Sequence, residues 1–173
     1  LATDFGFFGI AMAFIGPSTV IPSFLSALGA STALIGLMTT LQRAGWFLPQ
    51  LFAARQLGDK PYKKPYVVAA AGISRFLILV LAIVIGLTDA EPRAWLVPLA
   101  MLLFTAFWAG DGIGSVAWFD LLSKTIPPRR RGRLTGVGQA ISGVFGFLAG
   151  FAVEWMLSEH GPSFPQNYAL LFL

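Results

Sequence analysis

Three ionisable residues, Arg43, Arg75 and Asp111, lie inside long apolar segments of the chain. A carboxylate in such a place takes up a proton or holds a cationic group, and a guanidinium holds an anion. Either group costs about 2.5 to 3.5 kcal/mol on membrane-insertion scales, so it normally faces a partner or a water-filled cavity. We therefore keep two interpretations. Either an Asp–Arg pair holds the helices together, or Asp111 and Arg43 belong to a site that binds a substrate or couples a proton.

The acid Asp111 shares its predicted helix face with a hydroxyl group and two indoles. The four residues are Trp108, Asp111, Ser115 and Trp118. Their steps of three, four and three place them on one side of a helix. Further along, Asp120 precedes Lys124 by four residues, which predicts an ion pair near the cytoplasmic end of the same helix.

Arg43 lies in a second polar stripe. The stripe consists of Thr32, Gly36, Thr39, Arg43, Trp46 and Gln50. At helical spacing these residues share one side of a helix, and a polar side requires water or protein next to it rather than lipid. Arg75 has only small or apolar neighbours at helical spacing, which favours a structural role for that residue.

Glycine and proline interrupt two of the predicted helices. Pro17 follows Gly16, and the missing backbone donor predicts a kink near Ser18 and Thr19. The run 110–114 contains three glycines and should loosen the later helix. Interrupted helices at corresponding places in two three-helix repeats are typical of transporter binding sites.

Composition places the chain among membrane proteins. It has 173 residues, 56% of them hydrophobic and 12% charged, and its mean hydropathy is +0.74. Disordered, coiled-coil and nucleic-acid-binding proteins need a higher density of charge. Cysteine is absent and His160 is the only histidine, so the sequence offers no thiolate or histidine cluster for a metal. We expect no metal and no cofactor.

Long apolar segments predict an all-α, polytopic membrane bundle. Residues 5–42 carry no charge, and one helix of that length exceeds a bilayer, so the chain must turn back at 26–32. The predicted spans are 4–27, 32–54, 65–87, 94–122 and 134–157, and the start of a sixth at 167–173. The chain ends within an apolar run, so we expect residues 1–173 to be the amino-terminal bundle of a longer protein.

The distribution of cations predicts the orientation of these spans. Four cations lie in the loop 55–64 and five in the loop 123–133, nine of the twelve in the chain. Arg93 is the single cation in the loops on the other side. Cytoplasmic loops carry the lysine and arginine excess, so the amino end should be cytoplasmic, in an inner or plasma membrane. The stretch 129–133 then forms a solvated loop facing anionic headgroups rather than a nucleic-acid patch.

The last complete span carries small residues at intervals of four. They are Gly138, Ser142, Gly146 and Gly150. Such a ridge lets another helix approach closely, either within this bundle or from a part of the protein beyond the sequence.

The loop after the second span resembles a motif of the major facilitator superfamily of transporters, Gly-x-Leu-Ala-Asp-Arg-x-Gly-Arg-Arg/Lys. The matching residues are Leu57, Asp59, Lys60, Lys63 and Lys64. Arg55 and Tyr62 replace the two motif glycines. The stretch 126–133 is also similar to the basic loop after the fourth helix of many bacterial members, and the resemblance covers the whole chain.

The resemblance implies a twelve-helix fold of two halves, with a central cavity lined largely by helices 1, 4, 7 and 10. It further implies that the small-residue ridge packs on the missing carboxyl-terminal half. Asp59 would belong to a charge network that latches one conformation at the cytoplasmic side.

These features favour a secondary transporter that moves a small molecule by alternating access, coupled to a proton or ion. Arg43 indicates an anionic substrate, whereas the ring faces of Trp108 and Trp118 indicate an aromatic or cationic one. The alternative is a non-transporting membrane scaffold or sensor. A membrane-embedded enzyme is less favoured, because His160 has only Glu159 beside it and no catalytic cluster. The expected partners are the bilayer, a small-molecule substrate and the missing half, without nucleic acid.

Overall fold

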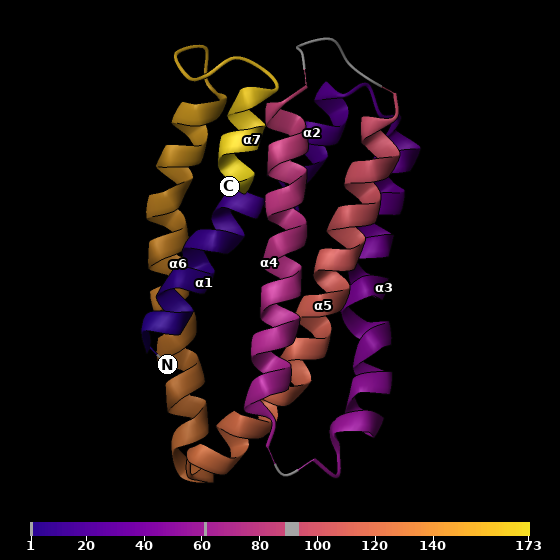
Figure 1. The fold of residues 1–173 in the computed structure, drawn as a ribbon. Coiled ribbons are helices and arrows are strands. Elements are labelled where there is room, and N and C mark those ends of the chain that lie inside the picture. Colours follow the sequence, from indigo (N-terminus) through magenta and orange to yellow (C-terminus); the bar gives the residue numbers. More distant parts are fainter. Residues whose placement is uncertain (1, 61, 89–93) are drawn as a thin grey trace. The chain divides into compact units, whose positions relative to one another are not determined.

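A computed structural model describes residues 2–60, 62–88 and 94–173. Over these ranges the backbone forms helices joined by short connections, without a strand (Figure 1). The helices are α1 (Ala2–Ile15), α2 (Val20–Ala27), α3 (Thr32–Leu57), α4 (Lys64–Gly86), α5 (Leu96–Thr125), α6 (Pro128–Leu157) and α7 (Gln166–Phe172).

Within the described ranges, four segments are long and apolar enough to cross a membrane. They are Thr3–Ala27, which joins α1 and α2, and the helices α4, α5 and α6. Helix α3 has 26 residues, but Gln42, Arg43 and Gln50 make it more polar, and α7 has only seven. The fold is therefore compatible with a multi-pass membrane protein, while the predicted count of five complete spans and a sixth is not confirmed.

The first predicted span, 4–27, is two helices. Gly16 adopts a φ of 48°, a left-handed conformation that glycine reaches without a steric penalty. Its carbonyl accepts hydrogen bonds from the N–H groups of Thr19 and Ile21, each at 3.0 Å. The helix therefore ends at Ile15 and restarts at Val20, around the place where the kink is predicted.

Two expectations about the later helices are wrong. Helix α6 begins at Pro128, so the predicted loop 123–133 is almost entirely helical. Proline is favoured in the first turn of a helix and arginine is a good helix former, so the helix continues where the apolar stretch ends. The glycines of the run 110–114 also do not interrupt α5, which is continuous over its 30 residues.

The described residues form two compact units. Unit 1 contains residues 2–24, 82–88 and 127–173, and unit 2 contains residues 25–60, 62–81 and 94–126. Helices α2 and α4 contribute residues to both.

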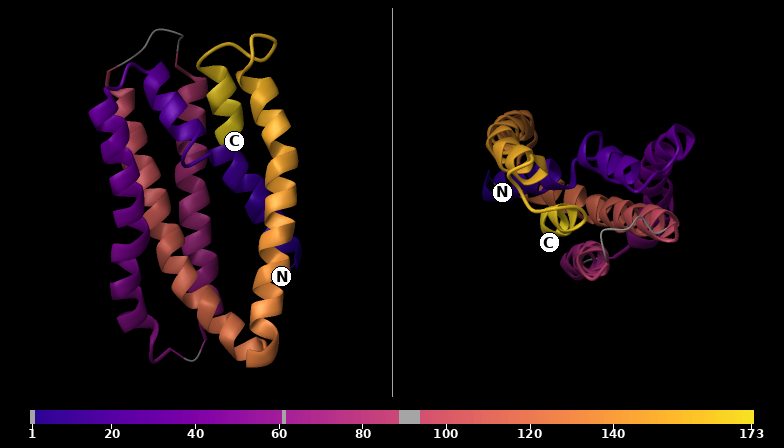
Figure 2. Two further views of the ribbon diagram at one scale, coloured as in Figure 1. Left: turned by 180° about the vertical axis from the view of Figure 1, so that it is seen from behind. Right: turned by 90° about the horizontal axis from the view of Figure 1, so that it is seen from above.

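In unit 1, α6 runs along α1, and α7 lies beside them (Figures 1 and 2). Helix α7 is held to α2 by aromatic contacts, with the rings of Phe24 and Tyr168 5.1 Å apart and those of Phe24 and Phe172 5.6 Å apart. The hydroxyl groups of Ser23 and Tyr168 are also hydrogen-bonded at 2.7 Å. This cluster fixes the last helix although it has only two turns.

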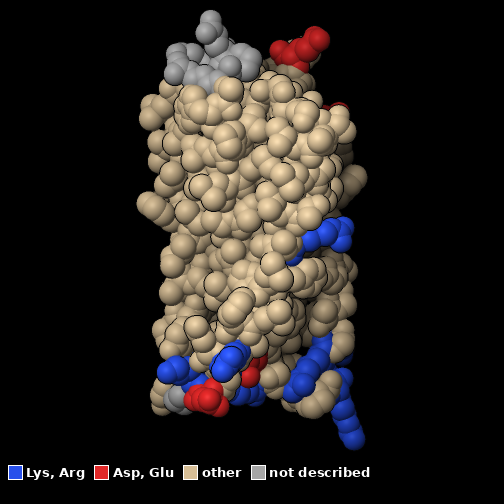
Figure 3. Space-filling view, turned by 90° about the vertical axis from the view of Figure 1, so that its right-hand side faces the viewer, with Lys and Arg blue, Asp and Glu red and all other residues tan. Residues whose placement is uncertain are grey.

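In unit 2, α3 and α5 run side by side (Figures 1 and 2). Their contact includes a buried cluster of Ala53, Leu57 and Ala117, against which Val67 and Val116 pack. Figure 3 shows a face on which most charged atoms gather at one end and acidic atoms lie at the other end. Between the two ends, basic atoms lie at one place on a surface that is uncharged elsewhere.

Candidate ion-pair site between α4 and α5

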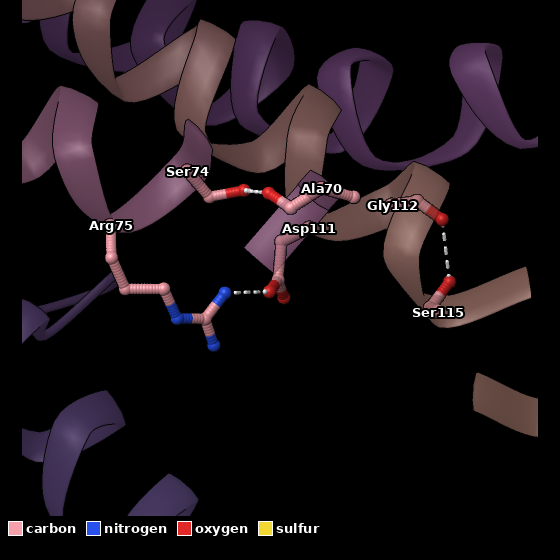
Figure 4. A network of polar contacts seen from close by, with 6 residues as sticks. All are labelled: Ala70, Ser74, Arg75, Asp111, Gly112 and Ser115. Atoms are coloured by element: carbon pink, nitrogen blue, oxygen red, sulfur yellow. Dashed lines mark hydrogen bonds and ion pairs between the residues drawn. The ribbon is translucent and has the colours of Figure 1, made fainter. Parts of the chain in front are cut away.

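Arg75 on α4 and Asp111 on α5 form an ion pair. The distance between Arg75 Nη1 and Asp111 Oδ1 is 2.9 Å, and the two side chains point toward one another (Figure 4). The side chain of Asp111 is 13% exposed, whereas that of Arg75 is 57% exposed. The carboxylate is thus held inside the unit by a cation that reaches it from the surface.

Two glycines beside Asp111 let the neighbouring helices come close. A Cβ atom at Gly110 would collide with the hydroxyl of Ser74 on α4, and one at Gly112 would collide with the carbonyl of Trp46 on α3. Ser74 is fully buried and donates its hydroxyl proton to the carbonyl of Ala70, at 2.6 Å. These glycines therefore bring α3 and α4 onto α5 around Asp111 instead of loosening the helix.

The indole of Trp108, which lies three residues before Asp111 on α5, is buried. It packs edge-on against Trp46, with centroids 5.9 Å apart, and against Phe107, with centroids 5.2 Å apart. Its Nε1 is buried and donates to no acceptor among the described residues. A buried N–H without a partner needs an acceptor from a water or a ligand, because leaving it unpaired costs free energy.

The other residues of the predicted face on α5 do not join the pair. Ser115 donates its hydroxyl proton to the carbonyl of Gly112, at 2.7 Å (Figure 4). Trp118 is half-buried, and its ring contacts Phe119 with centroids 5.0 Å apart. The helical spacing aligns these residues on one side of α5, but their side chains have separate partners.

The stripe on α3 contributes less than expected. Arg43 is exposed, and no carboxylate among the described residues forms an ion pair with it; Gln50 is half-buried. Ser18 and Thr19 are both exposed in the break between α1 and α2, and they belong to unit 1.

A second charged cluster lies at the end of α5. Asp120 Oδ2 is 2.8 Å from Lys124 Nζ and 3.3 Å from Lys63 Nζ. The predicted pair of Asp120 with Lys124 is therefore confirmed, and Lys63 is an additional partner that sequence reasoning missed. Lys63 directly precedes α4 and its side chain is only 8% exposed, so the charge of Asp120 compensates a buried cation.

The remaining residues of the resembling loop differ in their surroundings. Leu57 is buried in the cluster between α3 and α5. Asp59, Lys60 and Lys64 are exposed, and within the described part of the chain Asp59 has no ion-pair partner. The charge network in this part of the structure contains Lys63 and Asp120 rather than Asp59.

The small-residue ridge of α6 packs on α1 within unit 1. A Cβ atom at Gly9 would meet the backbone of Ser142, one at Gly146 would lie 3.3 Å from the carbonyl of Gly9, and one at Gly138 would meet the ring of Phe5. The ridge is therefore covered here by α1 and is not the exposed docking surface that the family resemblance implies. The fourth ridge residue, Gly150, has open space around its Cβ position.

Arg93, the cation expected on the other side of the membrane, lies outside the described residues. No group of three or more acidic or histidine side chains in the described ranges is arranged to hold a metal ion.

Comparison with protein-family models, with curated proteins and with solved structures gave no match for this chain. Function must therefore be inferred from the residues themselves.

Proposed function

We propose that the protein is a secondary transporter of a small molecule, and that the Arg75–Asp111 pair is its coupling site. The observation that carries this proposal is a mostly buried carboxylate, paired with a cation at 2.9 Å, in the middle of an apolar helix. Ionisable residues within membrane helices are costly, and they typically mark substrate pathways or proton relays.

The depth of Asp111 supports a role inside the membrane. It lies about midway along α5, some 22 Å from Leu96 and 21 Å from Thr125 at about 1.5 Å per residue. A purely interfacial ion pair would lie near one end of the helix. Binding sites of secondary transporters lie near the bilayer midplane.

The unequal exposure of the two partners suggests how the pair works. Arg75 is the exposed partner, whereas Asp111 is mostly buried and lies between two glycines that approach α4 and α3 closely. When a proton or a cationic group occupies the carboxylate, the attraction for Arg75 is lost and the guanidinium becomes free to hold an anion. Such an exchange biases two helix arrangements, as alternating access requires.

Trp108 supplies a further binding group in this proposal. Its unpaired Nε1 donates a hydrogen bond to an acceptor on the substrate or to a water that the substrate displaces. The substrate would thus combine a group that interacts with the ion pair and an acceptor for the indole.

The cluster of Lys63, Asp120 and Lys124 is proposed as a latch at the cytoplasmic end of the helices. It joins the start of α4 to the end of α5, so it has to open if these helices separate at that end. The amino end would be cytoplasmic. A cysteine at Lys60 in this cysteine-free chain should then react with an impermeant thiol reagent in inverted vesicles, and reaction in intact cells would contradict the orientation.

Transport can be tested in proteoliposomes that contain the pH-sensitive dye pyranine. We would screen a panel of amino acids, organic anions and organic cations for proton movement, and then measure uptake of the active compound. Asp111→Asn should abolish gradient-driven uptake but spare exchange of substrate across the membrane. Asp4→Asn, which removes an exposed carboxylate from α1, is the matched control and should transport normally.

Two results would contradict the proposal. Gradient-driven accumulation at the wild-type rate by folded Asp111→Asn would exclude Asp111 from coupling. Absence of flux for every compound by the folded wild type would favour the non-transporting scaffold or sensor.

A further inference from the structure

Helix α6 presents one exposed face along its whole length. At about 100° per residue, the residues on this face share an arc of roughly 100°. They are Arg129, Arg130, Arg133, Val137, Ala140, Val144, Phe147, Leu148, Phe151 and Trp155. The six larger apolar members are each between 51% and 67% exposed. The opposite side of α6 packs on α1 through the small-residue ridge, so within unit 1 the exposed face is the side turned away from α1.

The length of this face matches the hydrocarbon thickness of a bilayer. From Arg133 to Trp155 the helix rises about 33 Å, against roughly 30 Å for the hydrocarbon core. No charged residue lies between 134 and 153. Arginine at one end and tryptophan at the other are typical of the two membrane interfaces.

The three arginines are placed where a helix disfavours cations. They lie in the first two turns of α6, at the positive end of its dipole, and Pro127 provides no side-chain cap for the first N–H groups. Arg129, Arg130 and Arg133 are exposed, and no carboxylate in the described ranges pairs with them. Three exposed guanidinium groups without a carboxylate partner in the described ranges favour an anion next to them.

We infer that this face of α6 is a boundary with membrane lipid, and that Arg129, Arg130 and Arg133 bind the headgroup of an anionic glycerophospholipid. Its phosphate lies against the arginines and its acyl chains lie along Val137 and Val144. This site depends on the membrane location of the protein and is independent of transport.

Lipid fits this face better than a second protein helix does. Helices pack against one another in membranes through small residues, and three small residues of α6, Gly138, Ser142 and Gly146, pack on α1. The exposed face consists mainly of large apolar side chains, and only 6% of the most apolar stretch of α6 is buried, compared with 33% to 44% in the other three segments. Charge complementarity then selects an anionic headgroup at the arginine end.

Binding of lipid can be measured by native mass spectrometry of the purified protein with added phosphatidylglycerol or phosphatidylcholine. The triple variant Arg129→Gln, Arg130→Gln, Arg133→Gln should lose phosphatidylglycerol binding at least tenfold. The matched triple variant Arg55→Gln, Lys60→Gln, Lys64→Gln removes three exposed cations elsewhere and should retain it. Phosphatidylcholine binding should be weak and equal in all three proteins.

Two results of this experiment would overturn the inference. An equal loss in both triple variants would mean that only net charge matters. Displacement of phosphatidylglycerol by inorganic phosphate at similar concentration would mean that the arginines form a site for free phosphate without a role for the acyl chains.

The apolar part of the face needs a separate readout. A nitroxide spin label on Val144→Cys, in this cysteine-free chain, should collide often with oxygen and rarely with a water-soluble nickel complex when the protein is in a bilayer. Ala149→Cys, on the buried side of α6, is the control and should collide rarely with both. Low collision with oxygen at Val144 would show that protein covers the face, and frequent collision with nickel would show water; either result would overturn the inference.

Discussion

The two charged clusters on α5 lie about 14 Å apart along the helix and differ in which partner is buried. At Asp111 the carboxylate is mostly buried, and the one cation that pairs with it among the described residues, Arg75, is exposed. At Asp120 the cation Lys63 is buried, and the carboxylate meets a second cation, Lys124. The comparison teaches that a buried cation, whose carboxylate also meets a second cation, is suited to hold two helix ends together, whereas an exposed cation is free to leave its carboxylate.

The largest loss of stability is expected for Asp120→Asn. It removes the one carboxylate that compensates the buried ammonium of Lys63 in the described part of the chain, and an uncompensated buried charge is strongly destabilising. In detergent, the unfolding temperature of Asp120→Asn should fall at least about twice as far below that of the wild type as the unfolding temperature of Asp111→Asn does. The double variant Lys63→Met, Asp120→Asn should recover most of the loss, and failure to recover would mean that the cluster is not the cause.

A smaller loss of stability is expected for Asp111→Asn. Arg75 is 57% exposed and finds other partners when its carboxylate is removed, so the loss should be about 1 kcal/mol or less. A loss as large as that of Asp120→Asn, with recovery in the double variant Arg75→Gln, Asp111→Asn, would assign the pair a structural role.

The smallest effect is expected for Lys124→Gln. This lysine is 56% exposed and lies four residues from Asp120 on the same helix, and such pairs contribute little. The unfolding temperature of this variant should be close to that of the wild type. Added salt should lower it less than it lowers that of the wild type, because the variant lacks one ion pair that salt screens. If Lys124→Gln lowers the unfolding temperature as much as Asp120→Asn does, then Lys124, rather than Lys63, is the main partner of Asp120.

The ends of most helices follow from the sequence because local signals mark them. The expected ranges 32–54 and 65–87 correspond to α3 and α4 within three residues at each end. The start of α6 cannot be inferred from hydropathy. The apolar stretch begins only after the arginines, whereas the helix also includes them, because arginine is a good helix former. The sequence therefore indicates the membrane segments better than the helices that contain them.

The pairing of side chains is harder to infer. Arg43, Arg75 and Asp111 are at similar depth by residue count, but nothing in a uniformly apolar helix tells which way it turns toward its neighbours. In the structure Asp111 pairs with Arg75, whereas Arg43 is exposed and pairs with no carboxylate among the described residues. The contact of Lys63 with Asp120 was missed for the same reason, because it joins two helix ends that are far apart in sequence.

The central claim is that the Arg75–Asp111 pair faces a water-filled pathway, and a cysteine at Gly72 tests it most directly. Gly72 is exposed one turn before Arg75, with open space around its Cβ position, so Gly72→Cys should leave the fold intact. Ile73→Cys is the control, because Ile73 is 61% exposed but lies about 160° around the helix from Arg75.

The measurement is the rate of reaction of each cysteine with a membrane-impermeant, cationic thiol reagent in the reconstituted protein. The account predicts that position 72 reacts at least ten times faster than position 73, since only the side with Arg75 meets water. Equal and slow reaction at both positions would contradict it, and the ion pair would then be a structural contact surrounded by lipid or protein.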